Sequence, residues 1–218
     1  SMILWPEKKV LVPELNAGCS LADRCPADEF AKFVQEHPDY TVISYVNTTA
    51  AVKAVTDVVV TSTNAKQIVE SFPADEKIIF GPDRNLGNYI NSITGRNMLL
   101  WDGACHVHEQ FSVEKILELK KQYPAAAVLV HTECKGAVSK LADKVASTAG
   151  LLKYAIASDK KDFIVATESG ILHEMRKKCP EKNFIPAPPE DSTCACNECN
   201  FMRLNTLVKL YNTLKYEW

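Results

Sequence analysis

Residues 40–47 read YTVISYVN and residues 126–133 read AAVLVHTE, two short runs that are apolar for most of their length and end in polar side chains. Apolar runs of this length are typical of strands that are buried on both faces of a parallel sheet. The two runs begin 86 positions apart (126 − 40 = 86). They predict equivalent strands in two copies of one structural unit.

The same shift of 86 residues relates other features of the chain without a gap. It carries Cys19 onto Cys105, each behind a predicted strand, and Ser62 onto Thr148, each at a predicted helix start. Similarity at a fixed period indicates repeated structural units. We therefore expect a duplicated unit that ends in a strand followed by a cysteine loop.

A third copy of the cysteine loop would end at position 191 (105 + 86 = 191), where the sequence has Asp191. An insertion of eight residues (199 − 191 = 8) brings Cys199, the last residue of the run TCACNEC (193–199), to this place. If the units pack around a pseudo-threefold axis, three cysteines meet at the carboxyl ends of strands, where α/β proteins bind ligands. Three thiolates suit either zinc with one open position or a [4Fe–4S] cluster with one iron that lacks a protein ligand.

Strand patterns and amphipathic helix patterns alternate along most of the chain. This alternation predicts an α/β fold of repeated three-layer αβα units with short parallel sheets, related by pseudo-threefold symmetry. The predicted strands cover residues 8–15, 40–47, 57–62, 77–82, 97–103, 126–133, 162–168 and 183–188, and the predicted helices include 27–37, 64–72, 113–123, 147–158 and 170–179.

One predicted strand precedes Cys19, so we expect the first unit to be truncated. The predicted division assigns residues 1–19 to the last strand and cysteine loop of this truncated unit, 20–104 to a second αβα unit, 105–190 to a third, and 191–218 to a cysteine loop and C-terminal helix.

The composition excludes several classes of partner. The chain has 25 basic and 27 acidic residues, a net charge of −2 and no basic run, so we expect no nucleic-acid partner. Its apolar runs are far shorter than the roughly 18 residues that span a bilayer, and no secretion signal is recognisable. We expect a cytoplasmic protein without a membrane partner. Its eight cysteines are then better explained as thiols, metal ligands or catalytic groups than as disulfides.

Eight stretches of the chain are informative together: VPELNAGCSLAD (12–23), SYVNTTAAVKA (44–54), VVVTSTNA (58–65), GPDRNLG (81–87), LLWDGACHVHEQF (99–111), VASTAGLLKY (145–154), IVATESGILH (164–173) and FIPAPPEDSTCACNECNFMRLNTLVKLY (184–211). They resemble bacterial quinolinate synthase, and the resemblance covers about residues 8–211. It implies three similar αβα domains around a central [4Fe–4S] cluster, and an enzyme that condenses iminoaspartate with dihydroxyacetone phosphate to form quinolinate for NAD biosynthesis. The N-terminal domain of that family has no counterpart here, so we expect this chain alone to be inactive.

The resemblance also implies roles for individual residues. Cys19, Cys105 and Cys199 match the cluster ligands, and Thr132 stands where family members usually have proline. Iminoaspartate and dihydroxyacetone phosphate are the implied substrates, and a homodimer and an oxidase that supplies iminoaspartate are candidate partners. The implied catalytic residues are Glu133, His131, Tyr45 and His108, and the implied substrate-binding residues are Asn47, Ser62, Thr148 and His131.

Elementary chemistry is consistent with these roles but leaves alternatives open. Glu133 and His131 lie two apart on a strand, so both side chains leave the same face, where a carboxylate can transfer protons. His108 is preferred over His106 because alternate residues face opposite ways. Ser62 and Thr148 at helix starts could bind anions, although they could equally be ordinary N-caps. Cys25, Cys134 and Cys179 have no match in the triad and are expected to be buried thiols.

Two other functions remain open at this point. The run TCACNEC could belong to a zinc-stabilised binding module, although no second CxxC or HxxxH lies nearby to complete the ligands. Cys194 and Cys196 could instead form a thiol redox switch.

Overall fold

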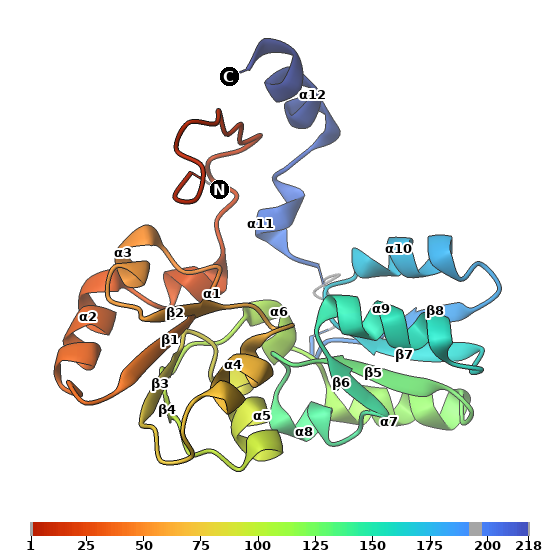
Figure 1. Cartoon of the computed structure of the whole chain (residues 1–218). Helices are drawn as coiled ribbons and strands as arrows, with labels where there is room; N and C mark the ends of the chain where they lie inside the picture. Colours follow the sequence, from red (N-terminus) through yellow and green to blue (C-terminus); the bar gives the residue numbers. More distant parts are fainter. Residues whose placement is uncertain (1, 192–197, 218) are drawn as a thin grey trace. The chain divides into compact units, whose positions relative to one another are not determined.

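The structure is a computed structural model that describes residues 2–191 and 198–217 (Figure 1). The chain divides into two compact units. The terminal unit combines Ser1–Cys19 with Cys199–Trp218, and the main unit comprises Ser20–Glu198. Cys194 and Cys196 lie outside the described residues. Within the described part of the chain, no helix combines the length and the apolar character needed to cross a bilayer.

The main unit contains two four-stranded sheets in which all strand pairs are parallel. The strand orders β2-β1-β3-β4 and β6-β5-β7-β8 are equivalent, which confirms the predicted α/β fold of repeated units. The strands are β1 Thr41–Tyr45, β2 Val58–Val60, β3 Ile78–Gly81, β4 Leu99–Leu100, β5 Ala127–His131, β6 Lys144–Ala146, β7 Asp162–Ala166 and β8 Asn183–Pro186.

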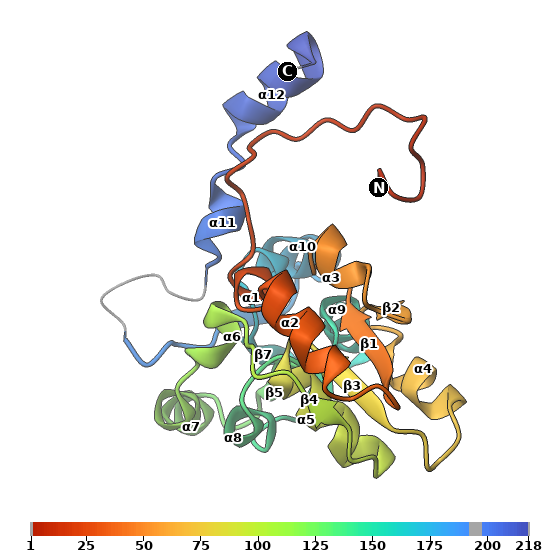
Figure 2. The same ribbon diagram turned by 90° about the vertical axis from the view of Figure 1, so that its left-hand side faces the viewer.

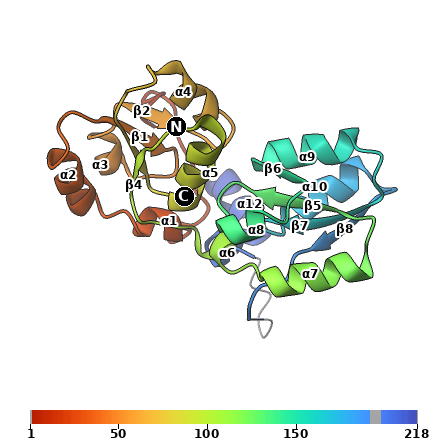
Figure 3. The same ribbon diagram turned by 90° about the horizontal axis from the view of Figure 1, so that it is seen from below.

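Helices cover both faces of each sheet. In the first lobe, Phe30 of α2 and Val52 of α3 pack on one face, while Val69 of α4 and Ile90 of α5 pack on the other. In the second lobe, the sheet lies between α9 and α10 on one side and α7 and α8 on the other (Figure 3). The bounds are α1 Ser20–Asp23, α2 Ala27–Gln35, α3 Ala50–Lys53, α4 Ala65–Ser71, α5 Arg84–Thr94, α6 His106–Glu109, α7 Val113–Gln122, α8 Gly136–Ser139, α9 Thr148–Ala157 and α10 Ile171–Lys178.

The shift of 86 residues holds in detail within the main unit. Adding 86 to the bounds of β1, β2, α1 and α3 gives the bounds of β5, β6, α6 and α8. It also relates two side-chain contacts: an Asp57 oxygen accepts from the Val42 N–H at 2.7 Å, and an Asp143 oxygen accepts from the Val128 N–H at 2.8 Å. The predicted duplication is therefore confirmed, whereas the pseudo-threefold axis and the division between residues 104 and 105 stay predictions.

The strand predicted over residues 8–15 is wrong. These residues form neither helix nor strand, as the trace in Figure 2 shows, and the Leu15 side chain is 88% exposed. A strand needs a neighbour for its backbone hydrogen bonds, and the described residues provide none here. Pro13 also lacks the N–H that a ladder uses. Conversely, the sequence patterns do not predict β6, a short edge strand whose residues are half-buried or exposed.

The terminal unit has little apolar core. It contains α11 Asn200–Arg203 and α12 Leu207–Tyr216, and the N–H of Lys209 donates to the Thr206 side chain that caps α12. Ion pairs of Lys209 with Glu14 and of Lys9 with Glu217 link α12 to residues 2–19. Many of its apolar side chains are exposed, with Leu207 and Val208 on α12 among them.

Candidate active site

Glu133 lies two residues beyond the end of β5, and its buried carboxylate contacts two histidines. His108 Nδ1 is 3.2 Å from Glu133 Oε2, and His131 Nδ1 is 4.0 Å from Glu133 Oε1. The side chains of all three residues are less than a tenth exposed. Three of the four residues that the sequence marks as catalytic therefore share one buried site.

His108 is positioned by α6 and by two neighbours from the second sheet. Its ring stacks on that of His131, with ring centroids 4.5 Å apart and an interplanar angle of 16°. Its Nε2 lies 3.0 Å from the hydroxyl oxygen of Thr167, directly behind β7. Sequence reasoning missed Thr167, although a polar residue behind an apolar strand was the available signal. His106, which was not chosen, instead lies 2.6 Å from the Ser20 hydroxyl.

The two histidines have opposite pKa shifts. Burial disfavours the His108 cation, but the neighbouring Cys105 and Glu133 side chains outweigh burial and raise the pKa of His108 to about 10. Burial and the neighbouring His108 lower the pKa of His131 to about 4. Burial alone would raise the pKa of Glu133, yet its contact with His108 lowers it. At neutral pH the site therefore holds a carboxylate, one imidazolium and one neutral imidazole.

The neutral ring of His131 has a defined orientation. The backbone N–H of Glu133 donates to His131 Nδ1 at 3.3 Å, so the ring proton of the neutral form is placed on Nε2. This tautomer leaves Nε2–H as a hydrogen-bond donor.

Tyr45 joins this group from the first lobe. It ends β1, and the side chains of Glu133 and Ser62 both act on the pKa of its hydroxyl. Burial and the nearby Glu133 raise the pKa of Tyr45 above its ordinary value, so it remains a phenol. Asn47 lies two residues beyond β1 at the same sheet edge and is half-buried.

The two predicted helix-start residues differ in position. Ser62 lies in a turn before α4, whose N-cap is Asn64, so Ser62 does not cap that helix. Thr148 is the first residue of α9 and is exposed. The capping side chain of α9 is Ser147, which accepts from the Gly150 N–H at 3.3 Å and was missed by sequence reasoning. Anion binding by Ser62 and Thr148 stays a prediction.

A buried carboxylate, Asp83, holds the loop that carries Cys105. Its two oxygens accept from the N–H groups of Leu86 at 2.8 Å and Cys105 at 3.2 Å. Burial and then the charge of Glu133 raise the pKa of Asp83 to about 7. A side chain at Gly103 would place its Cβ 2.4 Å from the Pro82 carbonyl oxygen, so this close approach requires glycine. Sequence reasoning missed Asp83, although it follows the apolar run 77–82.

Cys105 brings a sulfur into the same site. Ligand atoms of Cys105, His108 and Glu133 all lie within 4.8 Å of one another and could hold a metal ion. The three predicted ligands share one local setting, because Cys19, Cys105 and Cys199 each directly precede a four-residue helix. The meeting of the three sulfurs stays a prediction.

The other described cysteines are buried thiols, as expected from the sequence. Cys25, Cys134 and Cys179 are buried, with exposures of 1%, 2% and 3%, and all three are free thiols. Burial raises the pKa of Cys25 to about 12 and that of Cys134 well above its ordinary value. Thiols in this state are poor nucleophiles and poor metal ligands.

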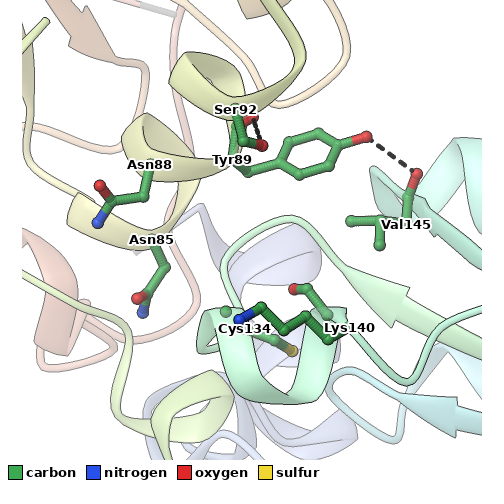
Figure 4. A pocket seen from close by; sticks show the side chains of 9 residues that line it. Asn85, Asn88, Tyr89, Ser92, Cys134, Lys140 and Val145 are labelled. Atoms are coloured by element: carbon green, nitrogen blue, oxygen red, sulfur yellow. Dashed lines mark hydrogen bonds between the residues drawn. The ribbon is translucent and has the colours of Figure 1, made fainter. Parts of the chain in front are cut away.

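Asn85 connects the two lobes beside the site. Its side-chain N–H donates to Glu109 Oε1 at 2.6 Å and to the Glu133 carbonyl oxygen at 3.1 Å. Asn85 and Tyr89 of α5 also line a cavity of about 470 Å³ together with Cys134 and Lys140 of the second lobe (Figure 4). The Tyr89 hydroxyl donates to the Val145 carbonyl oxygen at 3.4 Å.

Comparison with known proteins gives one consistent result. A family model described as quinolinate synthetase A protein matches residues 1–218. The chain is 55% identical over 213 residues to the quinolinate synthase of Chloroherpeton thalassium, a match that covers 98% of this chain and 66% of the relative. It is 57% identical over 209 residues to that of Thermosynechococcus vestitus, covering 96% and 66%. The chain therefore spans slightly less than two thirds of the length of these relatives.

Proposed function

The chain belongs to the quinolinate synthase family, and we propose from this premise that it provides the proton-transfer site of a quinolinate synthase. In this proposal the whole enzyme condenses iminoaspartate with dihydroxyacetone phosphate in the cytoplasm, releases phosphate and two waters, and forms quinolinate for NAD biosynthesis. Because the chain spans 66% of its relatives, activity is proposed for a full-length protein and not for this chain alone.

The observation that carries the proposal is the buried carboxylate of Glu133 between His108, His131 and Tyr45. A condensation followed by loss of water requires a base that removes protons from carbon and an acid that protonates leaving oxygens. Glu133 is ionised at neutral pH and is suited to the first task. The His108 cation and the Tyr45 phenol are positioned donors for the second, and they can stabilise oxyanions as charge develops.

Binding of the anionic substrates is assigned to hydrogen-bond donors near this site. We assign Asn47, Ser62, Thr148 and the Nε2–H of His131 to substrate carboxylate and phosphate groups. The influence of both Ser62 and Glu133 on the pKa of Tyr45 supports this role for Ser62, because it places the Ser62 side chain near the same phenol as the Glu133 carboxylate. Water exclusion from the buried cluster would strengthen each of these interactions.

The implied cofactor fits the residues that are present. Cys105 is a half-buried free thiol beside the acid–base group, and its donor chemistry suits an iron–sulfur cluster. We propose that Cys19, Cys105 and Cys199 hold a [4Fe–4S] cluster. When bound, such a cluster supplies a Lewis-acidic iron.

One observation favours a second candidate, a zinc-stabilised protein. Cys105, His108 and Glu133 offer sulfur, nitrogen and oxygen donors within 4.8 Å of one another, and zinc accepts such mixed ligands. The proposed thiol switch at Cys194 and Cys196 falls outside the described residues. A homodimer and an iminoaspartate-supplying oxidase remain proposed partners, and the exposed apolar side chains of α12 support the homodimer.

Anaerobic purification of the full-length protein separates these candidates. We expect iron and acid-labile sulfide in equal amounts, a brown chromophore, and quinolinate formation from iminoaspartate and dihydroxyacetone phosphate. A Cys105→Ser variant should lose the chromophore, whereas Cys179→Ser, a matched change at a buried thiol, should retain it. Zinc without sulfide would support the second candidate, and absence of quinolinate formation by an iron-loaded protein would reject the first.

A further inference from the structure

The turn that carries Glu133 is held by a side chain of the first lobe. The side-chain nitrogen of Asn85, near the start of α5, donates to the Glu133 carbonyl oxygen at 3.1 Å and to Glu109 Oε1 at 2.6 Å. A carbonyl and a carboxylate are both acceptors, so only the amide NH₂ group can serve them, and each of its two hydrogens has one partner. Asn85 therefore joins the backbone of Glu133 to α6, which ends at Glu109.

The duplicated turn in the first lobe is held differently. Beyond β1, Lys53 Nζ donates to the Val46 carbonyl oxygen at 2.9 Å and to the Thr48 hydroxyl oxygen at 3.0 Å. The position that corresponds to Lys53 in the second lobe is Ser139 (53 + 86 = 139), which is too short to do the same. The turn of Glu133 therefore receives its donor from the other lobe.

The duplication also shows that the repeated fold does not need an amide at this place on the helix. The residue that corresponds to Asn85 is Ile171 (85 + 86 = 171), which begins α10 and packs on the apolar core of the second lobe. One copy of the unit thus forms its helix with an apolar side chain here. The amide of Asn85 is better explained by its contacts with Glu133 and Glu109 than by the formation of α5.

The same amide fixes the spacing across the ion pair of His108 with Glu133. Glu109 directly follows His108 on α6, and its other oxygen, Oε2, accepts from Arg84 at 2.8 Å. The link from Glu109 through Asn85 to the Glu133 backbone thus runs beside the 3.2 Å contact between His108 Nδ1 and Glu133 Oε2. Groups that exchange protons must lie within hydrogen-bond reach, and a displacement of about 1 Å can lower a rate about 10²-fold.

We propose that Asn85 is a positioning residue that holds Glu133 against His108. Its effect on turnover rests on the proposed function, whereas its effect on the geometry of the pair can be measured without turnover. Asn85 acts through the backbone of Glu133 and through α6, and both of its amide hydrogens are used by the protein itself. Loss of this amide should therefore lower kcat rather than raise KM.

Steady-state kinetics of the full-length enzyme provide the first test. Asn85→Ala removes both donors and should lower kcat about tenfold. Asn85→Asp has nearly the same shape but places a carboxylate against two acceptors, so it should lower kcat about 10²-fold. KM should change by less than about twofold in both variants.

Tyr89→Phe is the matched control for these variants. Tyr89 also lies on α5 and also joins the lobes, because its hydroxyl donates to the Val145 carbonyl oxygen at 3.4 Å (Figure 4). Its bond is made away from Glu133 and Glu109. If the Asn85 variants act only by loosening the lobes, Tyr89→Phe should lower kcat as they do; we expect it to leave kcat unchanged.

Proton NMR of the 218-residue chain provides a second test that is independent of turnover. The His108 Nδ1–H bound to the Glu133 carboxylate should give a downfield ring signal, because charge-assisted hydrogen bonds are short. Loss of this signal in His108→Gln assigns it. It should shift or broaden in Asn85→Ala and Asn85→Asp and stay unchanged in Tyr89→Phe.

The outcomes separate this inference from the proposed function. An unmodified full-length enzyme that forms no quinolinate rejects the proposed function alone, and the ring signal then decides whether Asn85 holds the pair. The inference is overturned if the ring signal, or the kcat of an active enzyme, is the same in both Asn85 variants as in the unmodified protein. It is also overturned if Tyr89→Phe has as large an effect, or if the unmodified chain lacks the ring signal.

Discussion

The sheet edges behind β1 and β5 have the same backbone but different side chains. The end of β1 carries Tyr45 and, two residues on, Asn47, and the duplicated positions at the end of β5 carry His131 and Glu133. Both strands pair in the same order, and a backbone N–H of each donates to an equivalent aspartate. The duplicated fold therefore supplies the same scaffold twice. The residues at the strand ends differ, so one sheet edge carries a phenol and an amide and the other carries an imidazole and a carboxylate.

The largest expected effect comes from making the β5 edge resemble the β1 edge. Glu133→Gln gives it the amide chemistry of Asn47 and removes the base, so turnover of the full-length enzyme should fall by about 10² to 10⁴. Steady-state quinolinate formation measures this loss, and the visible chromophore should remain. Glu118→Gln, an exposed change on α7, serves as the control. A Glu133→Gln enzyme with normal activity would remove Glu133 from the mechanism.

Thr48 and Cys134 are a second pair of duplicated positions, and only Cys134 carries a thiol whose reactivity can be measured. Both backbone N–H groups donate to the carbonyl oxygen three residues earlier, at 3.2 Å and 3.0 Å. Because burial raises the pKa of Cys134 and of Cys25, both should be alkylated about 10²-fold more slowly at pH 8 in the folded chain than in urea. Peptide mass spectrometry after timed labelling measures this ratio. Equal rates in both states would contradict the buried setting.

A third comparison concerns Asp83 and its counterpart Ser169 (83 + 86 = 169). Asp83 is fully buried and accepts two backbone N–H groups, one of them from Cys105. Asp83→Asn replaces an acceptor with an amide donor, so the free energy of unfolding should fall by about 1–3 kcal/mol. Ser169→Ala should change it by less than about 0.5 kcal/mol. Urea unfolding measures both, and similar losses would show that the two positions are equivalent.

The smallest effect should be the same in both lobes. Asp57→Ala and Asp143→Ala each remove one hydrogen bond to the N–H of a buried strand, at 2.7 Å and 2.8 Å. Each change should lower the free energy of unfolding by about 1 kcal/mol. Urea unfolding curves of the two variants should therefore coincide. A clear difference would mean that the lobes have lost their equivalence in stability as well as in chemistry.

The sequence alone determined the repeated architecture. Apolar runs of strand length and amphipathic helical periods are local properties, so the two copies and their register of 86 residues follow from them. Cys25, Cys134 and Cys179 have no match in the cysteine triad and were therefore expected to be buried thiols, as they are. The sequence also marked Glu133 and His131 as neighbours on one strand face. It failed at residues 8–15, where a strand-like run has no partner strand, and at β6, whose edge position weakens the apolar pattern.

Only the tertiary structure decided how residues from different elements meet. The stacking of His108 on His131, the ion pair of His108 with Glu133 and the hydrogen bond from the Cys105 N–H to Asp83 each join groups from separate parts of the sequence. Such contacts depend on how the lobes pack, and packing is set by the sum of many buried contacts rather than by the pattern of any one segment.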